Sequence, residues 1–251
     1  MMIPLRVIDL GIKPYEEVLD FQRELVDLRA KDQIEDHLLL VEHSPSVVTL
    51  GRRSEPGQWA AASLPVIEVE RGGGPTYHGA GQLVGYPILK LAPGRPKLRE
   101  VLCYLEKTLI FALQEFGIQA ACREGLTGVW VEERKIASIG ISAKRWVTFH
   151  GFALNVNPDL SPFRQIKPCG LSGEVMTSMA LELSASSDQV LPPIDSVKKA
   201  FVHHFRSHFG YASGNFSISG GTVILSEAKD LDSSGTSCPQ NDRGRTFASS
   251  Y

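Results

Sequence analysis

The chain contains 251 residues, which is enough for one large domain or two small ones with a substantial buried core. Its 43% hydrophobic and 22% charged residues are typical of an ordinary soluble globular protein. The formal net charge of -2 provides no basic footprint, so nucleic acid is not expected as a partner.

The N-terminal residues, Met1 to Asp9, contain no apolar h-region, so we expect no signal peptide. No stretch approaches the roughly 20 apolar residues of a membrane span. The four cysteines have neither disulfide-like nor metal-like spacing, and without an export signal they are expected to be free thiols in a reducing compartment. The sequence therefore predicts a cytoplasmic protein that has no membrane partner.

Hydrophobic periodicity predicts strands and helices along the first 210 residues. Apolar side chains three or four residues apart mark the helices, and runs rich in β-branched and aromatic residues mark the strands. In chain order, we expect a strand at 3–10, a helix from Pro14, two strands within 37–50 divided at Ser44-Pro45, strands at 66–70 and 83–91, a helix at 97–116 ended by Gly117, a meander of strands at 128–132, 135–142 and 145–156, and a helix at 192–209.

Helices scattered among successive strands predict an α+β fold, in which helices pack on one or both faces of a mixed sheet. From Ala212 onward Ser, Gly, Asp and Asn dominate, and only Thr222–Leu225 could pair as a strand. We therefore expect a folded domain at 1–211 and a polar tail at 212–251 that is largely disordered and includes Cys238.

The most informative stretch is residues 71–86, in which five glycines fall between Arg71 and Gly81. Glycine runs usually form loops, and polar side chains between them predict a backbone that approaches a ligand closely. A plain surface loop is the alternative. The stretch lacks the Gly-Lys-Ser/Thr ending of a P-loop, and a strand follows it where a dinucleotide site needs a helix, so neither nucleotide motif is supported.

Cys169 stands between Pro168 and Gly170. Proline extends the backbone before it and glycine allows a tight turn after it, which would present the thiol as a nucleophile. The local sequence leaves open a second interpretation, a small buried hydrophobic residue. Cys103, in a helix, and Cys122, beside a strand edge, are expected to be core residues.

Lys135 follows an expected hairpin turn at Glu133-Arg134 and begins an apolar strand. It is either a solvated turn lysine or a side chain that points into the sheet. A partly buried lysine near a thiol would favour the thiolate and could carry its proton. Because 34 positions separate Lys135 from Cys169, the sequence alone leaves both interpretations open.

The histidines offer two candidate bases, His78 and His150, although each could instead be a structural hydrogen-bonding residue. His43, which is flanked by strand, is expected to be structural. His204 and His208 have the i,i+4 spacing of metal ligands, but no third ligand and no intervening Glu accompany them. We therefore expect a surface helix face there and no metal site.

Three separated motifs together resemble the octanoyltransferases of protein lipoylation, in the superfamily of biotin and lipoate protein ligases. They are Arg71-Gly-Gly-Gly-Pro-Thr-Tyr-His-Gly-Ala-Gly-Gln82, Arg134-Lys-Ile-Ala-Ser-Ile-Gly140 with 146–156 after it, and Pro168-Cys-Gly170 followed by Thr177-Ser178. The resemblance covers roughly residues 1–210. The chain has Ala80 where the family usually has proline, and the tail has no counterpart.

The resemblance implies the catalytic-domain fold of biotin and lipoate protein ligases, and it implies roles for individual residues. Cys169 resembles the nucleophile that forms an acyl-thioester, and Lys135 resembles the partner that lowers its pKa and handles protons. No metal or other cofactor is implied. The segments that resemble the acyl-site lining contain Arg71, Gly72, Gly73, Gly74, Pro75, Thr76, Tyr77, His78, Ser138, Ile139, Gly140, Gly151, Phe152 and Ala153.

The implied reaction moves an octanoyl group from octanoyl-acyl carrier protein to a lysine amine of lipoyl domains, which occur in 2-oxoacid dehydrogenases and the glycine cleavage H protein. Arg52, Arg53, Lys144 and Arg145 are candidates for contacting an acidic carrier protein, or are simply solvated. The nearest rival is an ATP-dependent lipoate or biotin ligase on the same fold, which would not need Cys169. Two more distant rivals are a cysteine hydrolase and a non-catalytic binding module.

Overall fold

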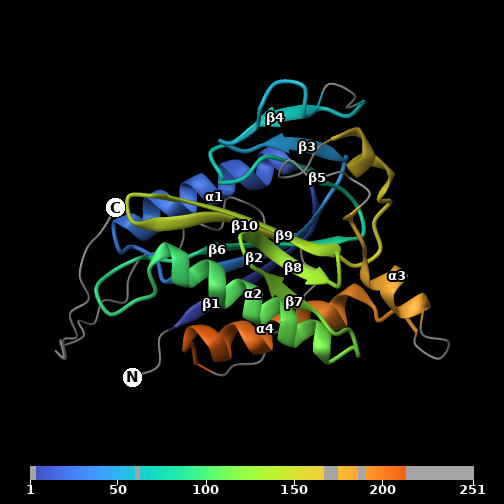
Figure 1. Ribbon diagram of the computed structural model, residues 1–251. Helices are drawn as coiled ribbons and strands as arrows, with labels where there is room; N and C mark the ends of the chain where they lie inside the picture. Colours follow the sequence, from blue (N-terminus) through green and yellow to red (C-terminus); the bar gives the residue numbers. More distant parts are fainter. Residues whose placement is uncertain (1–3, 60–62, 167–174, 186–189, 213–251) are drawn as a thin grey trace.

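A computed structural model describes residues 4–59, 63–166, 175–185 and 190–212. Its centre is a seven-stranded mixed sheet (Figure 1). The first two strands across this sheet are parallel, and each other pair of neighbours is antiparallel. In spatial order the strands are β1 (Leu5–Lys13), β2 (Asp36–His43), β6 (Gln82–Ile88), β10 (Val147–Asn155), β9 (Arg134–Lys144), β8 (Leu126–Val131) and β7 (Ala121–Arg123).

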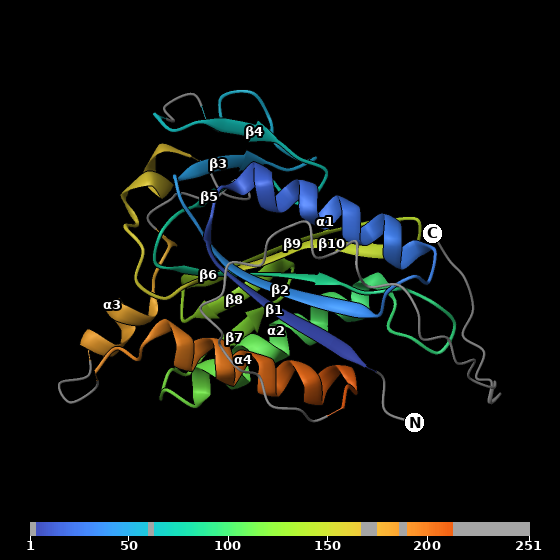
Figure 2. The ribbon, with the colours of Figure 1, turned by 180° about the vertical axis from the view of Figure 1, so that it is seen from behind.

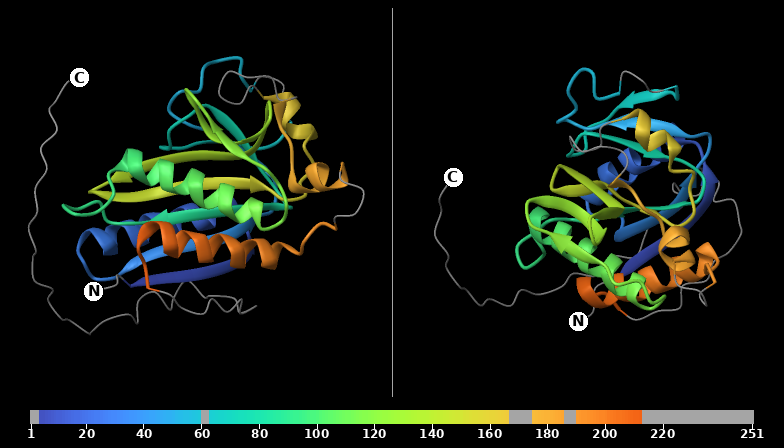
Figure 3. Two further views of the ribbon diagram at one scale, coloured as in Figure 1. Left: turned by 60° about the horizontal axis from the view of Figure 1, so that its bottom comes forward. Right: turned by 45° about the vertical axis from the view of Figure 1, so that its right-hand side comes forward.

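Helices cover both faces of this sheet. In β2, Leu38 and Leu40 point to one apolar core and Leu39 to the other, because successive side chains of a strand alternate between faces. A strand buried on both faces reads as a continuous apolar run, which explains the sequence of β2. One helix lies on one face (Figure 2), and two others lie side by side on the opposite face (Figure 3). These are α1 (Tyr15–Ala30) and the pair α2 (Leu98–Gln114) and α4 (Ile194–Phe209).

A second, three-stranded sheet packs against the start of α1, where Tyr15 and Leu19 contact Val47 and Val69. It was not predicted, because its third strand falls inside the stretch that was expected to be a loop. Thr76 and Tyr77 are good strand formers, and they pair antiparallel with the strand at 47–50. The order of strands is β4 (Val66–Glu68), β3 (Val47–Leu50) and β5 (Pro75–His78).

The strands and helices predicted from periodicity are confirmed, with ends that differ by a few residues, and so is the α+β class. The predicted break at Ser44-Pro45 separates β2 from β3. Three short elements were missed because they are too short to show a period. They are β7, a 3-10 helix (Ser161–Gln165) and α3 (Met179–Ser184).

The prediction that Cys103 and Cys122 belong to the core is wrong, because both thiols are exposed. Cys103 lies on the outer side of α2, and Cys122 lies in the edge strand β7. The tail predicted from Ala212 onward lies outside the described residues after that first position. Within the described part of the chain, no helix is both long enough and apolar enough to span a bilayer.

Candidate active site

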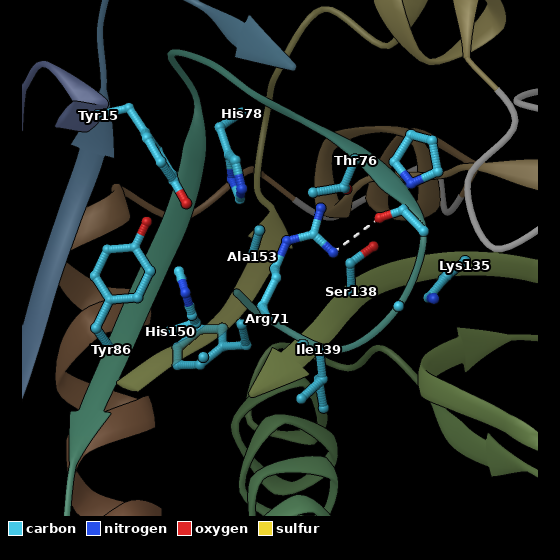
Figure 4. Close-up of a pocket in the computed structure, with 16 residues that line it drawn as sticks. Tyr15, Arg71, Thr76, His78, Tyr86, Lys135, Ser138, Ile139, His150 and Ala153 are labelled. Atoms are coloured by element: carbon cyan, nitrogen blue, oxygen red, sulfur yellow. Dashed lines mark hydrogen bonds between the residues drawn. The ribbon is translucent and has the colours of Figure 1, made fainter. Parts of the chain in front are cut away.

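A pocket lies where residues 71–78 cross the central strands β9 and β10 (Figure 4). Lys135 is at one end of it, and Tyr15, Tyr86 and His150 are at the other. We call the latter the tyrosine end. Most of the predicted site residues line this pocket, namely Arg71, Gly73, Gly74, Pro75, Thr76, His78, Lys135, Ser138, Ile139, Gly140, Gly151, Phe152 and Ala153.

Two glycines of the central strands let the backbones approach one another here. A Cβ atom on Gly140 would lie 2.9 Å from the carbonyl oxygen of Gly72, and one on Gly151 would lie 2.0 Å from that of Gly85. Neither distance is compatible with a side chain. The N–H of Gly72 also donates to the carbonyl oxygen of Ile141 at 3.1 Å. The glycine-rich stretch is thus held against β9 by a contact that requires glycine at position 140.

The buried side chain of Arg71 holds the same stretch in place through hydrogen bonds. Its side chain is buried, and its guanidinium donates to the carbonyl oxygens of Thr49 at 2.8 Å and Gly74 at 2.9 Å. The guanidinium also donates to the hydroxyl of Thr49 at 2.9 Å. Bonds of this charged kind contribute about 1.5–3 kcal/mol each, and a buried guanidinium needs such acceptors. Arg71 therefore ties the stretch to β3.

Lys135 is buried, with only 3% of its surface exposed, which settles the open question of its orientation. Its Nζ lies 5.5 Å from the centre of the Trp130 ring, within the range of a cation–π contact. Its side-chain stem passes over Gly128, where a Cβ atom would come within 2.5 Å of Lys135 Cε. The backbone of Lys135 accepts a hydrogen bond from the N–H of Thr177 at 3.0 Å.

Cys169 falls outside the described residues. The described residues on either side of it, Ile166 and Met176, share one apolar cluster with Tyr77. Met176 also forms a β-bridge with Lys135. Ile166 and Met176 thus both lie close to β5, and Met176 lies beside Lys135.

The tyrosine end combines aromatic rings with buried imidazoles. Tyr15 stacks on His78 with ring centres 5.4 Å apart, and the hydroxyl of Tyr86 is 2.7 Å from Nε2 of His43. Nδ1 of His43 is 3.1 Å from the carbonyl oxygen of Lys13. Because a carbonyl can only accept, Nδ1 carries the proton and Nε2 accepts from Tyr86. His43 is structural, as predicted.

Burial keeps these groups neutral. It lowers the pKa of His43 and of His150 to about 4, with Arg71 adding to the effect at His150. The pKa of His78 is well below its usual value because of burial and of the neighbouring His43 and Arg71. Burial also raises the pKa of Tyr15 to about 12. The imidazoles His78 and His150 are thus uncharged at neutral pH and offer acceptors as well as donors.

Some polar atoms around this end have no hydrogen-bond partner among the described residues. They are Nδ1 of His78, both ring nitrogens of His150 and the hydroxyl of Thr76. Nε2 of His150 is 3.6 Å from a carboxylate oxygen of Glu70, which is beyond hydrogen-bond range. Buried polar atoms normally have partners, so water or ligand atoms are expected beside these groups.

Two predicted residues do not reach this pocket. Gly72 lines a neighbouring cavity. The ring of Tyr77 points away, packs against Phe163 and places its hydroxyl 3.2 Å from that of Ser46, because strand alternation turns it opposite to Thr76 and His78. Sequence reasoning missed Tyr15 and Tyr86, which α1 and β6 bring to the pocket. No group of three potential metal ligands occurs in the described residues.

Comparison with known proteins agrees with this geometry. Residues 14–206 match the family model "Lipoyl protein ligase A/B catalytic domain". The octanoyltransferase of Syntrophotalea carbinolica is 46% identical, and the match covers 81% of this chain and 93% of that protein. The octanoyltransferase of Geobacter sulfurreducens is 44% identical over 71% and 75%, respectively.

Solved structures show the same fold at low identity. Lipoate-protein ligase A bound with ATP superposes with a TM-score of 0.61 at 14% identity, covering 91% of this chain and 94% of that one. The biotin protein ligase of Leishmania major superposes with a TM-score of 0.53 at 11% identity, covering 87% of each chain. The chain belongs to the lipoyl protein ligase A/B catalytic domain family and, within it, to the octanoyltransferases, which are acyltransferases of protein lipoylation.

Proposed function

We propose that this chain carries an octanoyl group from octanoyl-acyl carrier protein to a lysine amine of lipoyl domains, through a thioester on Cys169. The acceptors are the lipoyl domains of 2-oxoacid dehydrogenases and the glycine cleavage H protein. The observation that carries the proposal is the buried Lys135, placed at one end of a pocket whose walls contain most of the residues that resemble the acyl site.

In the first half-reaction Lys135 accepts the proton of the Cys169 thiol, and the thiolate attacks the thioester carbonyl of the donor. The carbon–sulfur bond to phosphopantetheine breaks, and the departing sulfur takes the proton from Lys135. In the second half-reaction the lipoyl lysine amine attacks the acyl-Cys169 thioester. Lys135 accepts the amine proton and returns it to the Cys169 sulfur, leaving an amide. Thioester exchange is nearly isoenergetic and amide formation is downhill, so neither half needs ATP.

Both halves pass through an oxyanion, which backbone N–H groups can stabilise. Gly72 is not a candidate donor to the oxyanion, because its N–H already donates to the carbonyl oxygen of Ile141. We therefore assign the donors to Gly170 and to Gly73 or Gly74, the last two of which line the pocket beside Lys135.

The acyl chain would extend from Lys135 toward the tyrosine end, and because the pocket has a volume of only about 40 Å³, its side chains would have to move apart to admit the chain. Phe152, Ile139 and Ala153 supply apolar surface along this path. The imidazoles at the end are neutral for the reasons given above, and the guanidinium of Arg71, which also lines the pocket, is held by the carbonyl oxygens of Thr49 and Gly74. We place the terminal methyl group beside Tyr15 and Tyr86.

We place carrier-protein docking at Arg52 and Arg53. Both are exposed, and the N–H of Arg53 donates to the carbonyl oxygen of Gly73 at 3.1 Å, so their loop is attached to the site. Lys144 and Arg145 are less suited, since nine residues of strand place Lys144 about 30 Å from Lys135. Charge reversal at Arg52 and Arg53 is expected to weaken the affinity for the carrier protein. Unchanged affinity would show that these two arginines do not form the docking site.

The test of function is transfer to an apo lipoyl domain with purified octanoyl-acyl carrier protein and no ATP. We expect octanoyl-lysine to form at a rate that ATP does not change. Modification that requires free octanoate and ATP, with none from the carrier protein, would make the chain a ligase and contradict the proposal.

A further inference from the structure

A second cavity of about 480 Å³ adjoins the pocket. The two share Gly73, Gly74, Lys135, Ile139 and Gly140 as common walls. The remaining walls come from Gly72, from Ile141 of β9, from the loop after β3, from α2 and from the β7–β8 hairpin. Its volume is within the range of small-molecule sites.

A thioester donor has two arms that diverge from one carbonyl carbon. If the acyl arm fills the pocket up to the tyrosine end, the sulfur arm must leave from the Lys135 end through a different space. The second cavity begins at Lys135. We infer that this cavity binds the phosphopantetheine arm of the acyl donor, an inference that rests on the proposed transferase function.

The chemistry of the walls suits that arm, which carries two amides, a gem-dimethyl group and a terminal phosphate. Trp130 lines the cavity, and because its indole nitrogen is buried away from the open space, it offers the arm apolar contact and no hydrogen bond. Leu102, Leu126 and Ile141 offer apolar contact for the dimethyl group.

The phosphate is assigned to the basic side of the cavity. Arg53 is exposed and lines it, although Glu55 and Gln58 share this wall. Arg53 and Lys135 are the cations among its walls, whereas Arg123, which lies over the Trp130 ring, is outside the cavity and pairs with Glu133 at 2.7 Å. The two cations of the walls favour a phosphate-bearing donor arm over the ammonium of an acceptor lysine.

The experiment compares two small donors, octanoyl-phosphopantetheine and octanoyl-pantetheine, which differ only in the phosphate. Acyl-enzyme formation is followed by intact mass. Arg53→Ala is expected to raise KM about ten-fold for the phosphorylated donor and to leave the other unchanged. Arg99→Ala, an exposed arginine outside both cavities, should change neither.

The phosphate site would be overturned if Arg53→Ala left KM for both donors at the wild-type value, or raised KM equally for both. Either result would leave the proposed transferase function intact. A wild-type protein that is acylated by neither small donor nor by octanoyl-acyl carrier protein would overturn the proposed function as well. Because Arg53 is exposed, its variant is expected to fold.

Discussion

Gly140 of β9 and Gly151 of β10 are directly paired on neighbouring strands of the central sheet, and neither position has room for a side chain. On one side Gly140 contacts Gly72, and on the other Gly151 contacts Gly85. The site therefore depends on closely packed backbones. The predictions below follow from this arrangement and from the groups it buries.

Gly151→Ala should be strongly destabilising, because the new Cβ would meet the backbone of Gly85 at 2.0 Å and backbone cannot rotate away. We expect a loss of about 3 kcal/mol or more in the free energy of unfolding, measured with denaturant. Gly72→Ala is the matched control, since its Cβ would meet only the oxygen of Ile141 at an ordinary 3.5 Å. Equal stability of the two variants would contradict the packing.

Lys135→Met should slow acyl transfer strongly while preserving the fold, because methionine fills the buried stem volume and lacks the amine. Proton transfer by a positioned group contributes about 10²–10⁴-fold, and we expect a loss in that range for acyl-enzyme formation. Lys107→Met, on the exposed side of α2, should keep the wild-type rate. A Lys135→Met enzyme with wild-type rates and an unaltered melting temperature would remove this lysine from the mechanism.

Stability should fall on acidification because of His43. Its pKa is about 4 in the folded protein and about 6.5 when unfolded, so below pH 6.5 the unfolded state binds a proton that the folded state does not. This group is expected to cost about 3 kcal/mol as pH drops from 6.5 to 4. His43→Asn should reduce the slope of unfolding free energy against pH. His203→Asn, at an exposed position, should leave the slope as in the wild type, and a slope that both variants share would contradict the assignment.

Tyr15 should limit acyl chain length, since it stands at the end of the pocket far from Lys135. Tyr15→Ala is expected to raise the ratio of kcat/KM for decanoyl over octanoyl donors by about ten-fold, because each extra buried methylene contributes about 0.8 kcal/mol. The ratio does not depend on how much folded enzyme remains. Tyr104→Ala, a tyrosine that packs on Phe209, is the control and should leave the ratio unchanged. An unchanged ratio in Tyr15→Ala would place the end of the chain elsewhere.

The elements of this fold could be predicted from sequence where the signal is local. The periodicity of 97–116 and the apolar run of β2 indicated their own conformations. The strand β5 could not be predicted, because the glycines around Thr76 and Tyr77 suggest a loop and the pairing partner is almost 30 residues away. The conformation of this segment is set by pairing with a strand that is distant in sequence, and not by its neighbours.

The residues of the candidate site also divide into those with a local sequence signal and those without one. The glycine-rich stretch and Lys135 were singled out from their neighbours in sequence, and both line one pocket, but the burial of Lys135 was left open by its position after a turn. Tyr15 and Tyr86 were missed, because nothing in a helix start or an apolar strand signals that a side chain will end a pocket. Cys103 and Cys122 were misassigned because free cysteine is usually buried, whereas these two face solvent.

The most direct measurement is peptide mapping of the acyl group after the enzyme is mixed with octanoyl-acyl carrier protein without ATP. We predict one octanoyl group on Cys169, still present in a Cys103→Ser/Cys122→Ser double variant that removes the two thiols exposed in the described part of the chain. The group should then pass to an apo lipoyl domain. An octanoyl group on Cys103 or Cys122, or a Cys169→Ala enzyme that still transfers at the wild-type rate, would contradict the central claim.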